Sequence, residues 1–333
     1  MLRTRVYSGT AYEVGLARGE ALKALPTPHA APEEVGFARA CVEVVGAVFP
    51  SALGVFRGIV DASGLVGDDF LAYYFARQEG VLRGCTMFAV TPPALMGDGI
   101  LVGRNYDWVY SDLKWCEARG IRQDGALPVV GYTHHWAGLP DALNGAGLFA
   151  AIASLPRLPR GRPGLQWNIA VDAVMATCRT VREAAEFLTF VVHLRAMSYL
   201  LADAAGDAAV VEAGPGGTTV RRANEGLVVA TNHEVSGTEA PERRRRSMGR
   251  YARVEAALRG YPGGVDEGVV RTVLSDHEGH VCAGFHAGHA EPFHRGEGWG
   301  TIWSSICRPD RHSLCVAPGH PCETDYQEVD FRF

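Results

Sequence analysis

One cysteine of this 333-residue chain stands in a context that suits nucleophilic chemistry. Cys85 follows Gly84 and opens the short apolar run 86–91. A cut in front of Cys85 would give that residue a free α-amine beside its thiol. Their reference pKa values, about 7.7–8.0 for the amine and about 8.5 for the thiol, are close enough for the proton to pass between them near neutral pH. Nucleophile and base would then share one residue, and no separate histidine would be needed.

The segment after Cys85 predicts a β-hairpin that returns to it. Residues 86–91 and 100–105 have the pattern of strands, and prolines and glycines punctuate the turn between them. Such a hairpin brings Arg104 and Asp107 back beside Cys85. Because residues two apart share a strand face, a guanidinium can lower the pKa of the thiol while a carboxylate further along holds the amine. The alternative is a buried structural cysteine beside an ordinary arginine–aspartate pair.

Over nearly its whole length the chain resembles the cysteine N-terminal nucleophile hydrolases. A Cys-Thr pair that opens a strand, followed by Gly-Arg-Asn-Tyr-Asp at 103–107, is similar to choloylglycine hydrolases, penicillin V acylases and acyl-coenzyme A:6-aminopenicillanate acyltransferase. The further strings similar to the acyltransferase branch are 9–15 with 18–19, 200–203 with 210–212, 231–233, 301–305 and 316–322. Each string alone is weak, whereas their common order is specific.

The resemblance implies an order of events at Cys85. The Cys85 thiol attacks the carbonyl of Gly84 and shifts the acyl group from nitrogen to sulfur, which suits a glycine because its missing Cβ allows close approach. In the activated chain the Cys85 thiolate attacks a linear amide, and the Cys85 ammonium protonates the leaving amine. Water or an acceptor amine then takes the acyl group. Arg104 and Asp107 match the pair that orients the new amine and tunes the thiol.

The resemblance also assigns roles to two asparagines and a second arginine. Asn144 and Asn232 match the sites that face the oxyanion, where loss of one donor typically costs about 2.7–4 kcal/mol of transition-state stabilisation. On local grounds both asparagines also suit turns or caps, and Asn144 does so because Gly145 follows it. Arg250 falls where the family has another active-site arginine, although the four arginines at 243–246 leave that register open.

Length and composition agree with an enzyme of this kind without indicating one. A chain of 333 residues, 47% of them hydrophobic, can bury a large core. The net charge of −5 offers no basic field for nucleic acid. No stretch approaches the ~20 apolar residues that span a bilayer, and no apolar segment follows the first five residues. We expect a soluble cytoplasmic enzyme that acts on a small-molecule acyl amide, without nucleic-acid or membrane partners; a homo-oligomer is left open.

The eight cysteines lie too far apart for the dense spacing of a secreted disulfide scaffold. Reduced thiols are therefore the expectation. Cys178 has the pattern of a helix core, and Cys307 and Cys315 lie in strand-like runs near the end of the chain. A pairing of Cys322 with Cys315 is left open by the sequence.

Hydrophobic periodicity divides the chain at the proposed cut. Residues 1–84 predict a mostly helical propeptide or α-chain, with helices over 12–25, 32–48 and 68–79, that stays bound after cleavage. Residues 85–333 form the catalytic β-chain. Its expected strands lie near 85–91, 100–105, 128–133, 147–153, 198–203, 208–213, 217–221, 227–231, 300–307 and 313–317, and its expected helices near 168–178, 181–190, 247–259 and 267–274. Paired strand blocks separated by helix pairs predict an α+β fold of two stacked sheets between helices, the four-layer αββα sandwich of N-terminal nucleophile hydrolases.

A metal-binding hydrolase or module is the alternative of another class. The loop 277–294 is rich in residues that bind zinc, namely His277, His280, Cys282, His286, His289 and His294. Its spacing differs from His-Glu-x-x-His, and glycines interrupt it. We therefore interpret it as a solvated or substrate-facing loop, and expect neither a metal nor a cofactor.

The sequence leaves the acyl and amine groups of the substrate open. Aromatic side chains after Cys85 could line an apolar acyl pocket, although aromatic residues at this density more often pack in a core. These are Tyr106, Trp108, Tyr110, Trp115, Trp136 and Trp167. A hydrolase of the choloylglycine or penicillin V acylase type is the alternative within the family, and the long N-terminal segment favours the acyltransferase branch.

Overall fold

The computed structural model describes residues 2, 4–22, 29–77, 84–134, 138–156, 162–235, 237, 241–284 and 298–333. Within these residues the strands form two sheets, one of eight strands and one of six. The larger sheet has the order β1-β4-β5-β6-β7-β8-β9-β10, and its neighbours are antiparallel except for the parallel pair β1 and β4. Its strands are β1 (Thr4–Gly9), β4 (Glu117–Gln123), β5 (Val129–Thr133), β6 (Asp141–Asn144), β7 (Leu148–Ser154), β8 (Met197–Asp203), β9 (Ala208–Gly214) and β10 (Gly217–Arg222).

The smaller sheet is antiparallel throughout and carries the segment around Cys85. Its order is β11-β2-β3-β12-β13-β14. Its strands are β2 (Thr86–Val90), β3 (Leu101–Val109), β11 (Leu227–Ala230), β12 (Trp299–Arg308), β13 (Ser313–Ala317) and β14 (Gln327–Glu328). The predicted hairpin is therefore present as β2 and β3, with Met87 opposite Arg104 in its register.

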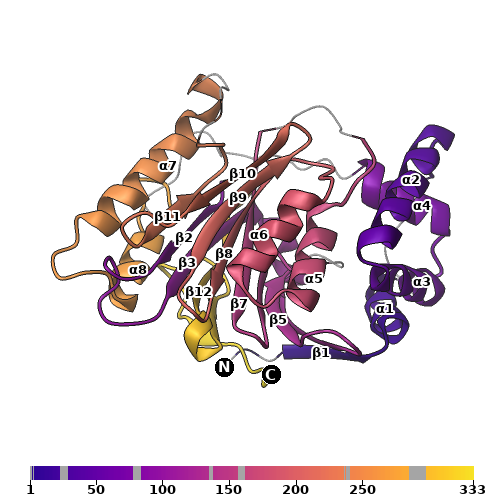
Figure 1. The fold of residues 1–333 in the computed structure, drawn as a ribbon, viewed down its shortest axis with the longest axis horizontal. Helices are drawn as coiled ribbons and strands as arrows, with labels where there is room; N and C mark the ends of the chain where they lie inside the picture. Colours follow the sequence, from indigo (N-terminus) through magenta and orange to yellow (C-terminus); the bar gives the residue numbers. More distant parts are fainter. Residues whose placement is uncertain are drawn as a thin grey trace.

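Helices cover both outer faces of the stacked sheets (Figure 1). Helices α7 and α8 lie on the six-stranded sheet, and α5 and α6 lie on the eight-stranded sheet. The helices are α1 (Ala11–Gly19), α2 (Pro32–Val48), α3 (Ser51–Ser63), α4 (Gly67–Ala72), α5 (Trp167–Thr177), α6 (Val181–Phe190), α7 (Pro241–Arg259) and α8 (Glu267–Leu274). The α+β fold of four layers, αββα, is therefore confirmed, with α1–α4 as an additional group beside it.

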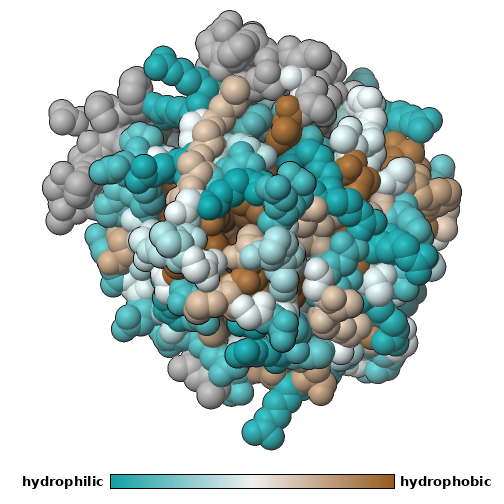
Figure 2. Space-filling view, turned by 60° about the vertical axis from the view of Figure 1, so that its left-hand side comes forward, coloured by the Kyte–Doolittle hydropathy of each residue, from teal (hydrophilic) through white to brown (hydrophobic). Residues whose placement is uncertain are grey.

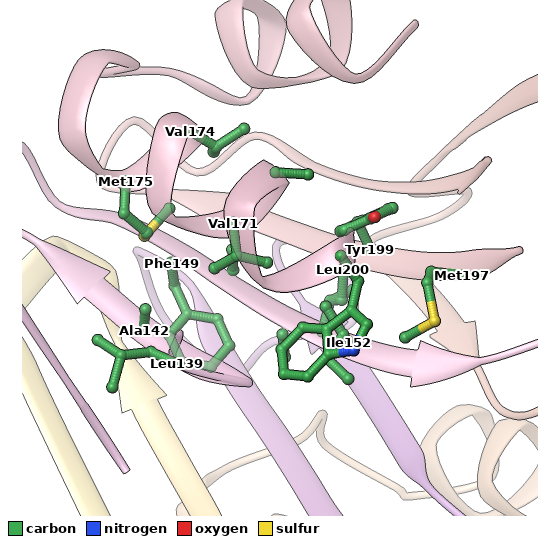
Figure 3. Packing of buried hydrophobic residues seen from close by; sticks show 14 of the residues in the cluster. Leu139, Ala142, Phe149, Ile152, Val171, Val174, Met175, Met197, Tyr199 and Leu200 are labelled. Atoms are coloured by element: carbon green, nitrogen blue, oxygen red, sulfur yellow. The ribbon is translucent and has the colours of Figure 1, made fainter. Parts of the chain in front are cut away.

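Two apolar cores hold these layers together. The larger core includes the contact between α5 and the eight-stranded sheet, where Val171 and Met175 lie above Phe149 of β7 (Figure 3). The second core lies under α7 and α8 and contains Phe88 of β2 and Val254 of α7. Because layers cover both faces of the smaller sheet, β2, β3, β11 and β12 are buried along almost their whole length, polar residues included.

The N-terminal segment begins with a strand that the sequence did not predict. Strand β1 pairs with β4 and so joins the eight-stranded sheet at its edge. Its six residues have a weak alternating pattern, and its partner lies far along the chain, so local periodicity had little to detect. The predicted helix over 32–48 is present as α2, whereas the helix expected over 12–25 ends at Gly19.

Helix α3 was also missed, because glycines lower its helix propensity. Gly58 of α3 faces the backbone of α1: a Cβ there would overlap the carbonyl oxygen of Tyr12. A Cβ on Gly15 of α1 would in turn overlap the carbonyl oxygen of Val55. The glycines therefore allow α1 and α3 to pack backbone against backbone.

Hydrophilic and hydrophobic side chains are mixed on the face drawn in Figure 2, and some of the hydrophobic atoms lie in a recess near its centre. None of the helices that the structure describes has both the length and the apolar character needed to cross a bilayer.

Candidate active site

Cys85 lies directly before the first residue of β2, an inner strand of the six-stranded sheet. It is only 5% exposed. The chain is continuous through Gly84 and Cys85 in this structure, so the nitrogen of Cys85 is an amide. The antiparallel register of β2 and β3 brings Cys85 level with Tyr106, between Arg104 and Asp107 of the same strand. As predicted, the hairpin places Arg104 and Asp107 close to Cys85.

A larger residue at Gly84 would force neighbouring side chains to shift. A Cβ at Gly84 would lie 2.8 Å from Oδ2 of Asp107 and 3.2 Å from Nη1 of Arg250. The backbone before Cys85 is therefore held directly against a carboxylate and a guanidinium. This close approach is a physical reason for glycine at this position.

Asn232 makes the direct contact with the amide of Cys85. Its Oδ1 accepts a hydrogen bond of 2.7 Å from the Cys85 N–H and one of 2.8 Å from Nη2 of Arg250. Its Nδ2 donates to the carbonyl oxygen of Ser154 at 2.9 Å. The side-chain amide of Asn232, which follows β11, thus connects the Cys85 nitrogen to Arg250 of α7 and to Ser154 at the end of β7.

The turn that carries Asn232 is fixed to α7. The backbone N–H of Asn232 donates to Oγ of Ser247 at 2.7 Å, and the same hydroxyl lies 2.8 Å from Thr231 Oγ1 and from His233 Nδ1. Helix α7 begins at Pro241, six residues earlier than expected, and it buries Ser247 and Arg250 on one face. The arginines 243–246 therefore lie in the first turns of α7, and the structure brings Arg250 to the site.

Arg104 points from β3 toward the other sheet. It forms a fully buried ion pair with Asp141 of β6, and its Nη2 donates to the carbonyl oxygen of Ile152 at 2.6 Å. Asp141 Oδ2 also accepts hydrogen bonds from Trp303 Nε1 at 2.8 Å and from Ser305 Oγ at 2.9 Å. The guanidinium is thereby fixed between the sheets, beside Cys85.

Asp107 points toward the other face of β3. Its Oδ1 accepts a hydrogen bond of 2.7 Å from Thr301 Oγ1 of β12, and Thr301 Oγ1 accepts one of 3.0 Å from the backbone N–H of Ala283. Arg104 and Asp107 therefore reach Cys85 from opposite sides of one strand, as an odd separation of three residues requires.

The surroundings of Cys85 keep its thiol protonated in the continuous chain. Burial raises the pKa of the Cys85 thiol to about 11, and the carboxylate of Asp107 adds to that increase. The guanidinium groups of Arg104 and Arg250 act in the opposite direction, as does a hydrogen bond from the backbone N–H of Asp107 to the sulfur. A nearby base is therefore needed to generate the thiolate near neutral pH.

The structure does not bring Asn144 to Cys85, which corrects the sequence-based assignment. Its Nδ2 donates to the carbonyl oxygens of Met175 at 3.0 Å and Cys178 at 2.8 Å. Its Oδ1 accepts from the backbone N–H of Ala146 at 3.1 Å and of Leu148 at 3.0 Å. Both donors and both acceptor positions are thus used to join the β6–β7 turn to the end of α5. Asn144 is the turn residue that its local sequence also suggested.

Aromatic side chains form a wall on the Arg104 side of Cys85. Tyr106 stacks on Trp303 with ring centroids 4.0 Å apart, and its hydroxyl lies 3.1 Å from His134 Nε2. Trp108 packs against Tyr106 and His134. Among the other aromatic residues considered for an acyl pocket, Tyr110 lies near His320, Trp115 is 51% exposed, Trp167 lies in α5, and Trp136 is outside the described residues.

Four residues of the site carried no role in the sequence interpretation: Asp141, Ser154, Thr301 and Trp303. Thr301 and Trp303 lay within a matched string, which was the available signal. Asp141 lies outside every matched string, so the sequence offered no comparable signal for it. Of the loop 277–294, the structure describes His277, His280 and Cys282; His286, His289 and His294 lie outside the described residues.

Residues 95–318 match the model of one protein family, described as acyl-coenzyme A:6-aminopenicillanic acid acyl-transferase. This match covers more than half of the chain. The chain belongs to this family. The match begins after Cys85, so the family model itself does not include that residue.

Several solved structures share the fold of this chain. A variant of conjugated bile acid hydrolase from Clostridium perfringens has a TM-score of 0.53 at 13% identity, over 74% of this chain and 97% of that chain. Penicillin V acylase from Agrobacterium tumefaciens has a TM-score of 0.51 at 17% identity, over 74% and 86%. An N-acylethanolamine-hydrolyzing acid amidase ortholog from Caenorhabditis elegans has a TM-score of 0.50 at 15% identity, over 68% and 93%. At such identities the likeness concerns the fold alone, and no curated protein sequence matches the chain significantly.

Proposed function

We propose that this protein cuts its own chain between Gly84 and Cys85 and then transfers or hydrolyses the acyl group of a linear, non-peptide amide through a Cys85 thioester. The observation that carries the proposal is the environment of the Cys85 nitrogen. Its N–H donates to Asn232 Oδ1, and the Asp107 carboxylate lies against Gly84. An acceptor and an anion around one backbone nitrogen are what a new ammonium group requires.

The cut follows from groups already in contact. The Cys85 sulfur attacks the Gly84 carbonyl carbon, a C–S bond forms, the C–N bond breaks, and the thiol proton passes to the departing nitrogen. Water then hydrolyses the thioester, which leaves a carboxylate on Gly84 and regenerates the thiol. The Arg250 guanidinium lies against Gly84, and we assign to it the stabilisation of the negative charge on the Gly84 carbonyl oxygen and of the resulting carboxylate.

In the cut chain, the amine of Cys85 acts as the base that the buried thiol lacks. It takes the thiol proton, and the cations Arg104 and Arg250 favour the thiolate that forms. The thiolate adds to the substrate carbonyl, and the Cys85 ammonium gives its proton to the leaving amine. Asn232 Nδ2 is the side-chain donor that we assign to the oxyanion; in the continuous chain it donates to Ser154.

We further propose that residues 1–84 stay bound to residues 85–333 after the cut. Strand β1 belongs to the eight-stranded sheet through its pairing with β4. Buried Arg18 lies 3.6 Å from Asp172 of α5, and Gln166 Nε2 donates to the Tyr74 carbonyl oxygen at 3.1 Å. Release of the segment would break these contacts and expose the core that α1–α4 share with the sheet.

The aromatic wall of Tyr106, Trp108 and Trp303 favours an apolar acyl group on the substrate. Water and an acceptor amine both remain candidates for the second step. A hydrolase of the kind named for the penicillin V and bile acid neighbours is the alternative outcome.

Trapping of the acyl-enzyme tests this proposal. The protein is mixed with N-acyl amines, N-acyl amino acids, penicillin V and glycocholate, quenched in acid and digested. We expect an acyl adduct on the peptide that begins at Cys85, together with released amine. Cys85→Ala abolishes both, while Cys116→Ser, which changes a half-buried cysteine, retains both. Amine release by Cys85→Ala at the wild-type rate would contradict the mechanism.

A further inference from the structure

A second group of chemically reactive side chains lies near the active site. The ligand atoms of His277, Cys282 and Cys322 all lie within 4.8 Å of one another. The sulfurs of Cys282 and Cys322 are 3.7 Å apart, and Cys282 Sγ is also 3.7 Å from Nδ1 of His320. Two segments supply these groups, namely the loop after α8 and the turn after β13.

The two distances of 3.7 Å, between the sulfurs of Cys282 and Cys322 and between Cys282 Sγ and His320 Nδ1, match those between ligands of one zinc ion. Zinc–sulfur bonds of about 2.3 Å in a tetrahedral site separate two sulfurs by ~3.8 Å, and a zinc–nitrogen bond of about 2.0–2.1 Å puts sulfur and nitrogen ~3.6 Å apart. The sulfurs of a disulfide would instead be about 2.05 Å apart. Two cysteines and two histidines are also one of the ligand sets of structural zinc.

The backbone on both sides holds the ligands in place. Cys282 N–H donates to the Asp276 carbonyl oxygen at 2.9 Å. This hydrogen bond closes the loop 276–282, which contains His277 and Cys282. On the other side, the backbone N–H groups of Glu323 and Thr324 donate to the His320 carbonyl oxygen. Compact loops of this kind preorganise ligands before a metal binds.

The second nitrogen of His320 has a partner that fits metal binding. His320 Nε2 lies 3.0 Å from the hydroxyl of Tyr110. With Nδ1 bound to a metal, Nε2 carries the proton and donates to the Tyr110 oxygen. Metal-binding histidines almost always use their other nitrogen in this way, which fixes the ring orientation.

We propose that His277, Cys282, His320 and Cys322 bind one zinc ion in a closed structural site. Binding releases the two thiol protons to solvent, and the two thiolates balance the charge of the ion. Four protein ligands leave no open position for water, so the site differs from the catalytic metal considered from the sequence. It also draws two ligands from outside the loop 277–294.

The zinc site would support the active site through one short path. Cys282 precedes Ala283, whose N–H donates to Thr301 Oγ1, and Thr301 donates to the Asp107 carboxylate. An ion that joins the two segments would therefore fix the position of Ala283. This proposal does not depend on the cysteine mechanism, because metal content is measured without substrate.

Metal analysis of the untagged protein, purified without chelator, tests the site. We expect one zinc per chain by atomic emission and free thiols at Cys282 and Cys322 after digestion without reductant. Cys282→Ser and Cys322→Ser lose the zinc, while Cys315→Ser, also a cysteine near the end of the chain, keeps it. A metal-free protein that takes up no zinc on dialysis, a Cys282–Cys322 disulfide, or zinc retained in both cluster variants would overturn the proposal.

X-ray absorption at the zinc edge gives a measurement on the wild-type chain alone, in case the variants fail to fold. We expect two sulfur neighbours at about 2.3 Å and two nitrogen neighbours at about 2.0–2.1 Å. A spectrum with oxygen and nitrogen neighbours but no sulfur would contradict the ligand set.

Discussion

Asn232 and Asn144 are two asparagines that the family pattern assigned to the same task, and the structure separates them. Both are buried, with exposed fractions of 8% and 0%. The side-chain oxygen of Asn232 accepts hydrogen bonds from the Cys85 amide and from Arg250. The side chain of Asn144, in contrast, forms its hydrogen bonds with backbone groups of a turn and of a helix end. Burial and residue type are thus shared, and the identity of the hydrogen-bond partners distinguishes a site residue from a structural one.

We expect the largest difference in chain cutting between alanine substitutions of two glycines, Gly84 beside Cys85 and Gly145 beside Asn144. A Cβ at Gly84 would lie 2.8 Å from Asp107 Oδ2, and a Cβ at Gly145 would lie 2.8 Å from Pro128 Cγ, so the two clashes are matched in distance. We expect Gly84→Ala to block cutting, because the added methyl displaces the carboxylate and guanidinium around the scissile bond. Gly145→Ala should still be cut. Intact mass spectrometry measures both outcomes, and efficient cutting of Gly84→Ala would contradict the assignment.

Asn232→Ala should lower kcat by about 10²–10³, the usual cost of one oxyanion donor. It also removes the acceptor of Cys85 N–H, so cutting should be slowed. The measurement is kcat on the best substrate from the screen, with the cut fraction determined by mass. An Asn232→Ala enzyme that is cut and within threefold of the wild-type kcat would remove Asn232 from the mechanism.

Asn144→Ala should act on stability instead. It leaves two carbonyl oxygens and two N–H groups buried without their partner, which we expect to cost about 2–4 kcal/mol of unfolding free energy. Urea unfolding measures this loss. Activity per folded molecule should stay within about twofold of wild type, and a loss of kcat as large as that of Asn232→Ala would restore Asn144 to the site.

The smallest predicted effect concerns the pH dependence of the uncut thiol. Burial raises the pKa of Cys85 to about 11, so the thiolate fraction below that pH increases tenfold with each pH unit. In the uncut chain, the alkylation rate of Cys85 by iodoacetamide should therefore rise steadily to at least pH 10. A plateau near pH 7 would show that the thiol ionises without the amine.

Local patterns predicted much of this molecule. The hairpin around Cys85, the helix over 32–48 and the paired strands of the second half each follow from short-range periodicity and turn residues. The four-layer plan follows from their order. Arg104 and Asp107 could be identified because they lie on the second strand of the hairpin that follows Cys85. The pairing of the two strands fixes their distance from Cys85.

What the sequence did not provide depends on contacts between distant segments. Strand β4 carries glycine and charged residues, and β6 has only four residues; both are strands because their neighbours pair with them. Asp141 matters only because Arg104 reaches it from the other sheet, and Ser154 only because Asn232 does. Asn144 matched the motif, yet its partners at the end of α5 decide its role. The cytoplasmic location stays a prediction.

N-terminal sequencing of the purified, active protein is the most direct test of the central claim. The account predicts two chains, one of which begins at Cys85, and both should remain together in gel filtration. Active protein with a single chain and no terminus at Cys85 would contradict it.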